Sequence, residues 1–193
     1  QVFYGDSGVA LLSNFGEAEL DGYNLILYRA LKEGVADLAA EGGEAQVVVD
    51  LGEDAITWKS SAESNEVLGA EMSQAFADSG IVLDTIMSCL LADCPYELYW
   101  YDKTYWDEEN EIGAVSMGYS ASASDGIGRI SEITFRFVVS EGYRETASDM
   151  YTVDDDTRAV VEAANAARAI AKQYRGYSDY AKMIAFRDEI CEL

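Results

Sequence analysis

Four aromatic residues gathered within eight positions are the first side chains in this sequence that suggest chemistry. Tyr99, Tyr101, Tyr105 and Trp106 offer flat rings with polar edges, and such rings can stack on sugars and peptides. The sequence therefore predicts a candidate ligand-binding surface at these four residues. The alternative, which we favour from the sequence, is that the rings fill the core and the rim of a domain of helices and strands.

An acidic cluster follows these rings directly. Asp107, Glu108, Glu109 and Glu111 stand next to Trp106, and a glycoside hydrolase needs two carboxyl groups across a cleft. The sequence supplies the residue types but not the separation between the carboxyl groups. A solvated acidic loop is the simpler interpretation, and a carboxylate-based glycoside hydrolase is the alternative that stays open.

The sequence contains no histidine, and this absence restricts its chemistry. A Ser–His–Asp or Cys–His nucleophilic pair cannot form within the chain. The imidazole ligands on which most catalytic zinc sites rely are also missing. We therefore assign no catalytic residue, no metal ligand and no cofactor from the sequence.

The three cysteines are Cys89, Cys94 and Cys191, and an odd number does not predict a disulfide framework. Cys89 and Cys94 could pair only if the helix between them ends, because a continuous helix holds their Cα atoms too far apart. Buried free thiols are the interpretation we favour. Helical spacing puts Cys191 on the same side as Ile184 and Ile190, which predicts a packing role for it.

Composition indicates a globular and strongly acidic chain of 193 residues, 49% of them hydrophobic. Thirteen Lys and Arg against 36 Asp and Glu give a net charge of −23. This argues against nucleic acid or anionic lipid as a partner, because phosphate contacts need a basic face. We expect no membrane insertion, because no apolar run reaches the length of a span. The first residues do not resemble a signal peptide, although a secreted protein whose signal is removed would look the same.

Hydrophobic periodicity predicts the elements that would position these groups. Spacings of three and four predict helices at 17–40, from Ser64, at 81–91, at 157–175 and from Ser178. Alternating or β-branched runs predict strands at 45–51, 56–59, 96–101, 113–124 and 127–140. The predicted fold class is α+β: an antiparallel sheet with a long β-hairpin, packed by about five helices.

Three local predictions accompany this pattern. The segment Tyr96–Tyr101 has large residues on both faces and predicts a central strand after Pro95. Residues 102–112 predict a polar loop. Residues 1–16, rich in Gly, Ser and Asn, predict a loosely attached lead-in.

Two stretches of the sequence resemble a known family. LLADCPYELYWYDKT at Leu90–Thr104 and ARAIAKQYRGYSDYAKMIAFRDEICEL at Ala167–Leu193 are similar in order and spacing to the N-terminal region of secreted or cell-envelope transglutaminase-like proteins of Gram-positive gut bacteria. In that family an "SDYEK…IHDYIC"-like helix opens a papain-like cysteine-enzyme domain. The residues that match this pattern are Ser178, Asp179, Tyr180, Lys182, Asp188, Ile190 and Cys191.

The resemblance implies a non-catalytic N-terminal domain. The family's nucleophilic cysteine and its histidine base lie downstream of the opening helix, and residues 185–191 lack the histidine of the family pattern. It implies an α+β domain at 1–153, and a helical segment at 154–193 that leads into a transglutaminase-like domain absent from this chain. The expected partner is that downstream catalytic domain, and the expected location is outside the cell or in its envelope.

A binding module for cell-wall glycan or peptide is the alternative that the aromatic residues themselves suggest. Its candidate ligand-binding residues are Tyr99, Tyr101, Tyr105 and Trp106. The carboxylate-based glycoside hydrolase remains the third interpretation.

Overall fold

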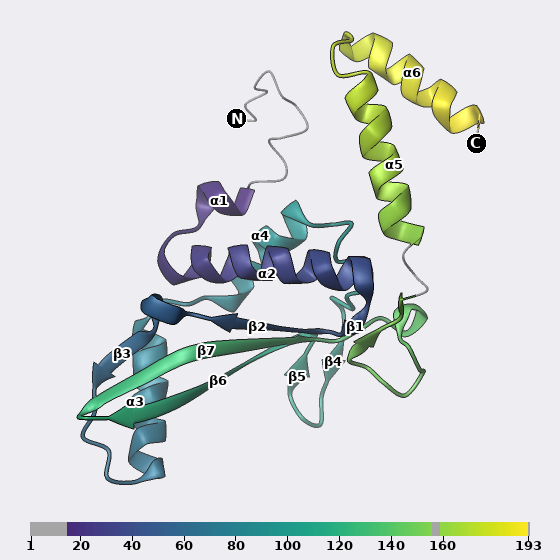
Figure 1. The fold of residues 1–193 in the computed structure, drawn as a ribbon. Helices are drawn as coiled ribbons and strands as arrows, with labels where there is room; N and C mark the ends of the chain where they lie inside the picture. The colour runs from purple at the N-terminus through teal and green to yellow at the C-terminus, as the bar shows by residue number, and fades with distance from the viewer. Residues whose placement is uncertain (1–14, 156–158, 193) are drawn as a thin grey trace. The chain divides into compact units, whose positions relative to one another are not determined.

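The computed structural model describes residues 15–155 and 159–192, which belong to two compact units. The first unit, residues 15–155, combines helices with antiparallel strands, and the second, residues 159–192, is a pair of helices (Figure 1). The predicted α+β class is thus confirmed. The sequence predicts that the acidic run Asp154–Thr157 caps the helix at 157–175; its last two residues, and residues 1–14 of the predicted lead-in, lie outside the described residues.

Six helices and eight strands lie in the described residues. The helices are α1 (Phe15–Glu19), α2 (Gly22–Glu41), α3 (Asn65–Asp78), α4 (Leu83–Asp93), α5 (Ala159–Gln173) and α6 (Asp179–Glu192). The strands are β1 (Gly43–Glu44), β2 (Gln46–Asp50), β3 (Ile56–Lys59), β4 (Trp106–Asp107), β5 (Ile112–Gly113), β6 (Val115–Ser124), β7 (Ile127–Phe137) and β8 (Thr152–Val153). Two short 3₁₀ turns, η1 (Gly52–Asp54) and η2 (Glu141–Tyr143), interrupt the connections.

The strand β7 organises the main sheet. It pairs along one edge with β6 and along the other edge with β2 and then β3, and all of these pairs are antiparallel. The predicted β6–β7 hairpin turns at Asp125 and Gly126, which both have positive φ. The ladder shifts by one residue at Ser131, and the same point separates β2 from β3.

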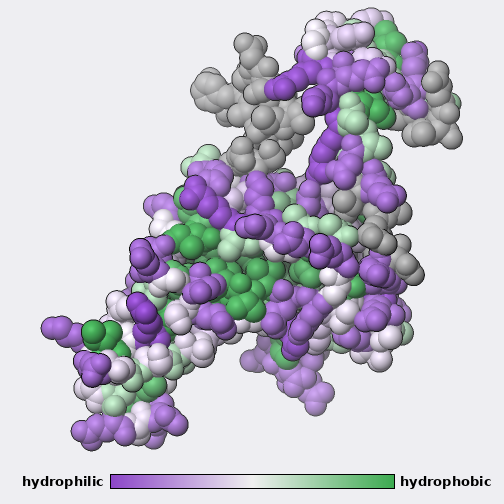
Figure 2. Space-filling view, viewed as in Figure 1, coloured by the Kyte–Doolittle hydropathy of each residue, from purple (hydrophilic) through white to green (hydrophobic). Residues whose placement is uncertain are grey.

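Helices cover one face of this sheet. Phe135 and Phe137 of β7 are fully buried, whereas Arg136 between them is exposed, as expected for a strand with one covered face. The helix α2 packs on β2, α4 packs on α2, and α3 lies against β3, β6 and β7 (Figure 1). α2 comes close to the sheet at Gly34, where a Cβ would meet the Val47 side chain at 2.6 Å. Figure 2 shows apolar surface gathered between α2 and the sheet, with polar residues over much of the rest.

Helix ends follow the predicted signals with one exception. Gly42 ends α2 with a positive φ of 71°, and the Ser64 hydroxyl accepts the Val67 N–H at the start of α3 (3.4 Å). The predicted single helix at 17–40 is instead two helices. Asp21 is extended and Gly22 has a φ of 50°, which breaks the helix between α1 and α2.

The predicted central strand at Tyr96–Tyr101 is wrong. Residues 95–100 form consecutive turns after α4, in which the Leu98 N–H donates to the Cys94 carbonyl at 3.1 Å and Tyr101 to Leu98 at 3.1 Å. Local turns therefore use the backbone groups that a strand would offer to neighbours, and Tyr101 keeps a single bridge to Val139. Of the large residues in this segment, Leu98 and Trp100 are buried in the core, whereas Tyr96 is exposed.

The segment predicted as a loop at 102–112 contains a small hairpin. β4 and β5 pair antiparallel, with Trp106 opposite Gly113 and Asp107 opposite Ile112. A strand pair this short has little stability of its own. Its turn chemistry is described below with the acidic cluster.

A buried carboxylate ties the start of the first unit to its centre. Asp93 accepts the backbone N–H groups of Phe15 (2.9 Å) and Gly16 (2.8 Å) and the hydroxyl of Tyr28 (2.5 Å). Lys32 donates to the same Tyr28 hydroxyl at 3.2 Å. Gly16 lies so close to the Tyr28 ring that a Cβ would approach it at 2.5 Å. The described end of the predicted lead-in is therefore held firmly rather than loosely attached.

The pKa of Asp93 is lowered. Burial by itself raises it, but the hydrogen bonds from Tyr28, Gly16 and Phe15 and the charge of Lys32 outweigh that effect. The folded pKa therefore lies below the unfolded value of about 3.9. The stability from Asp93 is fully present above that unfolded pKa and is lost as the pH falls below it towards the folded pKa.

Replacing Asp93 should be costly. We expect Asp93→Ala to lower the free energy of unfolding by about 3 kcal/mol, because two buried donors and one partly buried donor lose their acceptor. Tyr28→Phe removes one of these bonds and should cost about 1 kcal/mol. Asp84→Ala, an exposed carboxylate in the same helix, is the control and should cost less than about 1 kcal/mol. Urea unfolding measures all three, and the deficit of Asp93→Ala should shrink below pH of about 4.

Candidate functional site

Two of the four aromatic residues predicted to bind a ligand pack against other rings of the first unit. Tyr99 meets Tyr143 edge-on with 5.2 Å between ring centroids, and Tyr101 meets Phe137 in the same way at 5.7 Å. Burial, and then the charge of Asp102, raises the pKa of Tyr101 to about 12. Both rings are half-buried, so each offers a ligand only part of its surface.

The other two aromatic residues lie at the β4–β5 hairpin. Trp106 is 58% exposed and its ring passes 3.9 Å from the position of a Cβ at Gly113. Tyr105 is half-buried, and burial followed by the charge of Asp107 raises its pKa. Of the four predicted ligand-binding residues, only Trp106 is therefore exposed, and Tyr99, Tyr101 and Tyr105 are half-buried.

The acidic cluster next to Trp106 shapes a turn. Asp107 accepts the N–H groups of Glu109 (3.0 Å) and Asn110 (3.2 Å) and the side-chain amide of Asn110 (2.8 Å). The Asn110 side chain is the main reason that the pKa of Asp107 is lowered. Glu111 completes the turn with a φ of 54°. These contacts account for Asp107 as a structural residue.

The pKa shifts of the carboxyl groups give no support to the alternative of a glycoside hydrolase. A general acid at neutral pH needs a carboxyl group whose pKa is raised. Within residues 15–155 and 159–192, every carboxyl group with a resolved shift has a lowered pKa. The same residues contain no group of three His, Cys, Asp or Glu side chains placed to hold a metal ion.

Two cysteines are buried and the third is exposed. Cys89 and Cys94 are free thiols inside the first unit, as favoured from the sequence. Burial, then the charge of Asp93, raises the pKa of Cys89, which keeps it an unreactive thiol. The predicted packing role of Cys191 is wrong, because its side chain is exposed. Within the pair, α6 diverges from α5 along its length, which separates its last turn from α5 (Figure 1).

The pair α5–α6 has little interior of its own. Ala164 is its only fully buried side chain among those described. Tyr180 and Met183 are 74% and 70% exposed, and Tyr177 is also mostly exposed. The connection between the helices is ordered by Ser178, whose hydroxyl accepts the Ala181 N–H at 3.3 Å. This hairpin therefore presents apolar side chains that it does not cover itself.

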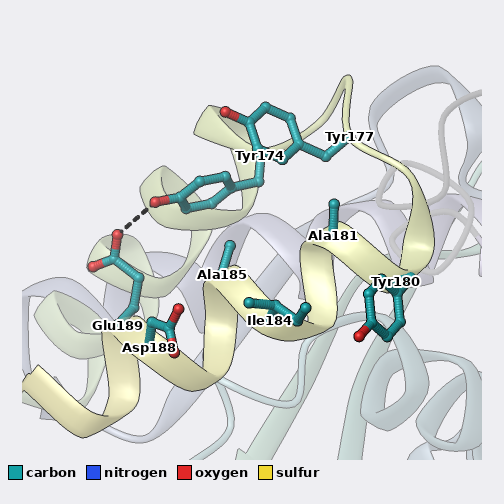
Figure 3. Close-up of a pocket in the computed structure, with 8 residues that line it drawn as sticks. All are labelled: Tyr174, Tyr177, Tyr180, Ala181, Ile184, Ala185, Asp188 and Glu189. Carbon is teal, nitrogen blue, oxygen red and sulfur yellow. Dashed lines mark hydrogen bonds between the residues drawn. The ribbon is translucent and has the colours of Figure 1, made fainter.

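An aromatic cleft of about 460 Å³ lies on one side of the hairpin (Figure 3). The Tyr174 hydroxyl donates to a carboxylate oxygen of Glu189 at 2.8 Å, and its ring meets that of Tyr177 edge-on at 5.2 Å. Figure 3 shows these two rings over the side of α6 that holds Ala181 and Ala185. The remaining lining residues are Tyr180, Ile184 and Asp188.

A second, almost wholly apolar groove of about 560 Å³ belongs to the same hairpin. It is lined by Ala163, Ala166, Ala167, Ile170, Ala171, Phe186 and Glu189. Five small or branched side chains of α5 form its floor, so the backbone of another helix could approach closely. The groove suits apolar side chains of a protein better than a polar metabolite, because Glu189 is its one charged lining residue.

Charge is divided unequally between the two units. Residues 15–155 hold seven Lys and Arg against 29 Asp and Glu, whereas residues 159–192 hold five of each sign. The α5–α6 hairpin is thus electrically neutral on a strongly acidic chain. Among the described residues no single helix is long and apolar enough to cross a membrane, and the one pair that qualifies together, α3 with α4, bends by 52° at its break.

Sequence reasoning missed two of these features. The groove follows from the alanine-rich run at 163–171, whose small residues recur at helical spacing and could have been read as a packing ridge. The Asp93 network had one signal, a lone acid at the end of an apolar helix, where the helix dipole disfavours it.

Comparisons with protein-family models, with curated proteins and with solved structures found no match to this chain. The resemblance described above therefore rests on residue patterns alone and stays a prediction.

The exposure of Trp106 predicts its fluorescence behaviour. Trp100 is fully buried and Trp58 is half-buried, so Trp106 should account for most of the quenching by acrylamide. We expect Trp106→Phe to remove the steepest component of a Stern–Volmer plot. Trp58→Phe serves as the control and should leave that component in place. An unchanged plot in Trp106→Phe would show that this ring is covered.

Proposed function

We propose that this chain is a non-catalytic domain that docks through its α5–α6 hairpin onto the catalytic domain of a secreted transglutaminase-like cysteine enzyme. The observation that carries the proposal is the apolar groove on a hairpin with one fully buried side chain among those described. The role of the domain would be to position or to cover the catalytic domain.

The physical argument begins with the stability of the hairpin. Helices of 15 and 14 residues are marginal by themselves in water, and most helices in proteins are stabilised by burying an apolar face. The groove between Ala163 and Phe186 is that face. A protein surface that fills it would stabilise both helices and would remove exposed apolar area from water.

The distribution of charge favours the α5–α6 hairpin as the part of the chain that contacts a partner domain. The first unit carries a large negative charge that repels other acidic proteins. The hairpin is neutral, because its five basic residues balance its five acidic residues. A folded domain can therefore approach α5–α6 with less electrostatic opposition than at the first unit.

The identity of the partner rests on the resemblance of residues 90–104 and 167–193 to the family's N-terminal region. Secretion or attachment to a Gram-positive cell envelope follows from the same resemblance. Because the chain has no histidine, any cysteine-enzyme chemistry would belong to the partner domain.

Hydrogen exchange tests the docking. In the purified chain, amides of residues 159–192 should exchange at least about a hundredfold faster than those of β7, because local opening is easy where little is buried. In the full gene product they should be protected. Ala167→Glu, which adds a charge to the groove, should abolish that protection, whereas Ala169→Glu, also on α5 but outside the groove lining, should preserve it.

Two results would contradict the proposal. Equal exchange of α5–α6 in the purified chain and in the full gene product would mean that nothing docks there. Thiol-dependent transamidase or peptidase activity of the purified chain that survives Cys191→Ala would mean that the chain is itself an enzyme.

A second candidate function is binding of cell-wall glycan or peptide, which the exposed ring of Trp106 favours. A solvent-facing indole next to Tyr105 on a projecting hairpin is a stacking surface for a sugar or a peptide. The packed rings of Tyr99 and Tyr101 would then support the hairpin rather than meet the ligand fully.

Titration with soluble peptidoglycan fragments tests this second function. We expect the tryptophan emission to shift on binding in the unmodified chain and the shift to vanish in Trp106→Ala. Tyr96→Ala, which removes another exposed ring, is the matched control and should bind normally. No spectral change in the unmodified chain would end the idea.

A further inference from the structure

The two edges of the main sheet differ in their protection. The β2–β3 edge is interrupted by η1 and carries Asp50, Glu53, Asp54 and Lys59. β6 is a continuous edge of ten residues, VSMGYSASAS, without a charge or a proline. Natural sheets usually blunt such edges with charges, prolines or short strands, because an open edge pairs readily with another chain.

The backbone of β6 offers regularly spaced hydrogen-bonding groups. The Val138 N–H donates to the Ala114 carbonyl at 2.8 Å. This bond shows which residues of the two strands direct their backbone groups toward each other. Because directions alternate along an antiparallel pair, Val115, Met117 and Tyr119 point their N–H and C=O groups away from β7. No other strand of the described residues pairs with that edge.

Half-covered apolar side chains lie beside the same edge. Phe76 of α3 stacks on Tyr119 of β6 with ring centroids 4.1 Å apart and planes within 7°. None of the residues of α3 is fully buried, although Met72 and Phe76 pack against the core. A further strand beside β6 would cover these rings with every second side chain.

The helix α3, which carries Phe76, is held in a fixed position beside the sheet. Glu71 fixes α3 to the end of β3 by accepting the Trp58 indole N–H (3.1 Å), the Ser60 hydroxyl (2.6 Å) and the Ser61 N–H (3.0 Å). These bonds, with that of Ser60 the largest, lower the pKa of Glu71 to about 2. The carboxylate therefore stays ionised and holds α3 in place at neutral pH.

We propose that β6 binds an extended segment of a partner polypeptide as an added strand. Val115, Met117 and Tyr119 supply the main-chain hydrogen bonds, and apolar residues at alternate positions of the segment pack beside Tyr119 and Phe76. Lys or Arg residues flank the segment, because the first unit carries 29 acidic against seven basic residues. This site is separate from the α5–α6 groove and does not depend on it.

A defined peptide tests the inference. The probe is an acetylated, fluorescently labelled peptide, Lys-Val-Thr-Val-Thr-Val-Thr-Lys, and the readouts are its anisotropy and residue-resolved amide exchange of the whole chain. Before binding, the amides of Met117 and Tyr119 should exchange quickly, and those of Gly118 and Ser120 slowly. Binding should slow Met117 and Tyr119 by at least about tenfold and leave Gly118 and Ser120 almost unchanged.

Matched variants locate the site. Met117→Pro removes one outward N–H and should weaken binding at least about tenfold, because proline is tolerated on an edge but cannot donate. Val48→Pro makes the same change on the other edge of the sheet and should leave the affinity within about twofold. Each variant is checked for folding by thermal unfolding. A probe with Glu in place of both Lys residues should bind at least about tenfold more weakly at low salt.

Three outcomes would overturn the proposal. The first is that neither probe binds. The second is that the peptide binds but the amides of β6 show no alternating protection. The second result is decisive even if Met117→Pro does not fold. The third is protection of the β6 amides that rises with protein concentration in the absence of peptide. That result would make a second copy of the chain the occupant.

Discussion

A buried negative charge at the carboxyl end of α4 is the constraint on which the first unit depends. The helix dipole disfavours a carboxylate there, and Asp93 is compensated by donors from distant parts of the chain. Two of them are the first N–H groups of α1, which otherwise lack partners. The charge thus joins the end of one helix to the beginning of another and holds α2 beside them through Tyr28.

The second organising element is β7, which turns a local hairpin into a sheet. Its partners β2 and β3 come from about 70 to 90 residues earlier in the chain, and they meet it on either side of the irregularity at Ser131. The gap between β2 and β3 and the irregularity in β7 lie at the same level of the sheet, and both interrupt the regular hydrogen bonds between strands there. Helices then cover one face, and the fully buried Trp100 packs edge-on against Phe137 at 5.8 Å. Its indole N–H finds no acceptor among the described residues, which costs about 1–3 kcal/mol.

The described residues combine ionised carboxylates and buried thiols with two open, largely uncharged surfaces. Carboxyl groups with resolved shifts are all kept ionised by hydrogen bonds or charges, and the two described thiols of the first unit are buried. By contrast, an apolar groove on a neutral hairpin and an uncharged strand edge lie open on the two units. The net negative charge of the first unit opposes association between copies of the chain, although apolar surfaces are exposed.

The sequence by itself determined what depends on near neighbours. The long hairpin with its turn at Asp125–Gly126, the cap at Ser64 and the stop at Gly42 were all predictable, because a few adjacent residues decide them. The absence of histidine likewise limited the chemistry without any coordinates. Of the candidate site, the sequence identified the aromatic and acidic residues but not which of them would be open.

Tertiary structure decided what depends on distant contacts. Whether Tyr96–Tyr101 is a strand depends on where its backbone groups find hydrogen-bond partners. In the structure, local turns provide several of these partners. Cys191 is exposed, which no residue spacing within α6 could reveal. The partners of Asp93 and the open side of β6 are likewise properties of assembled elements. The spacing of side chains in the sequence shows which face of a helix or strand a residue lies on. Only the packing of the elements decides what lies opposite that face.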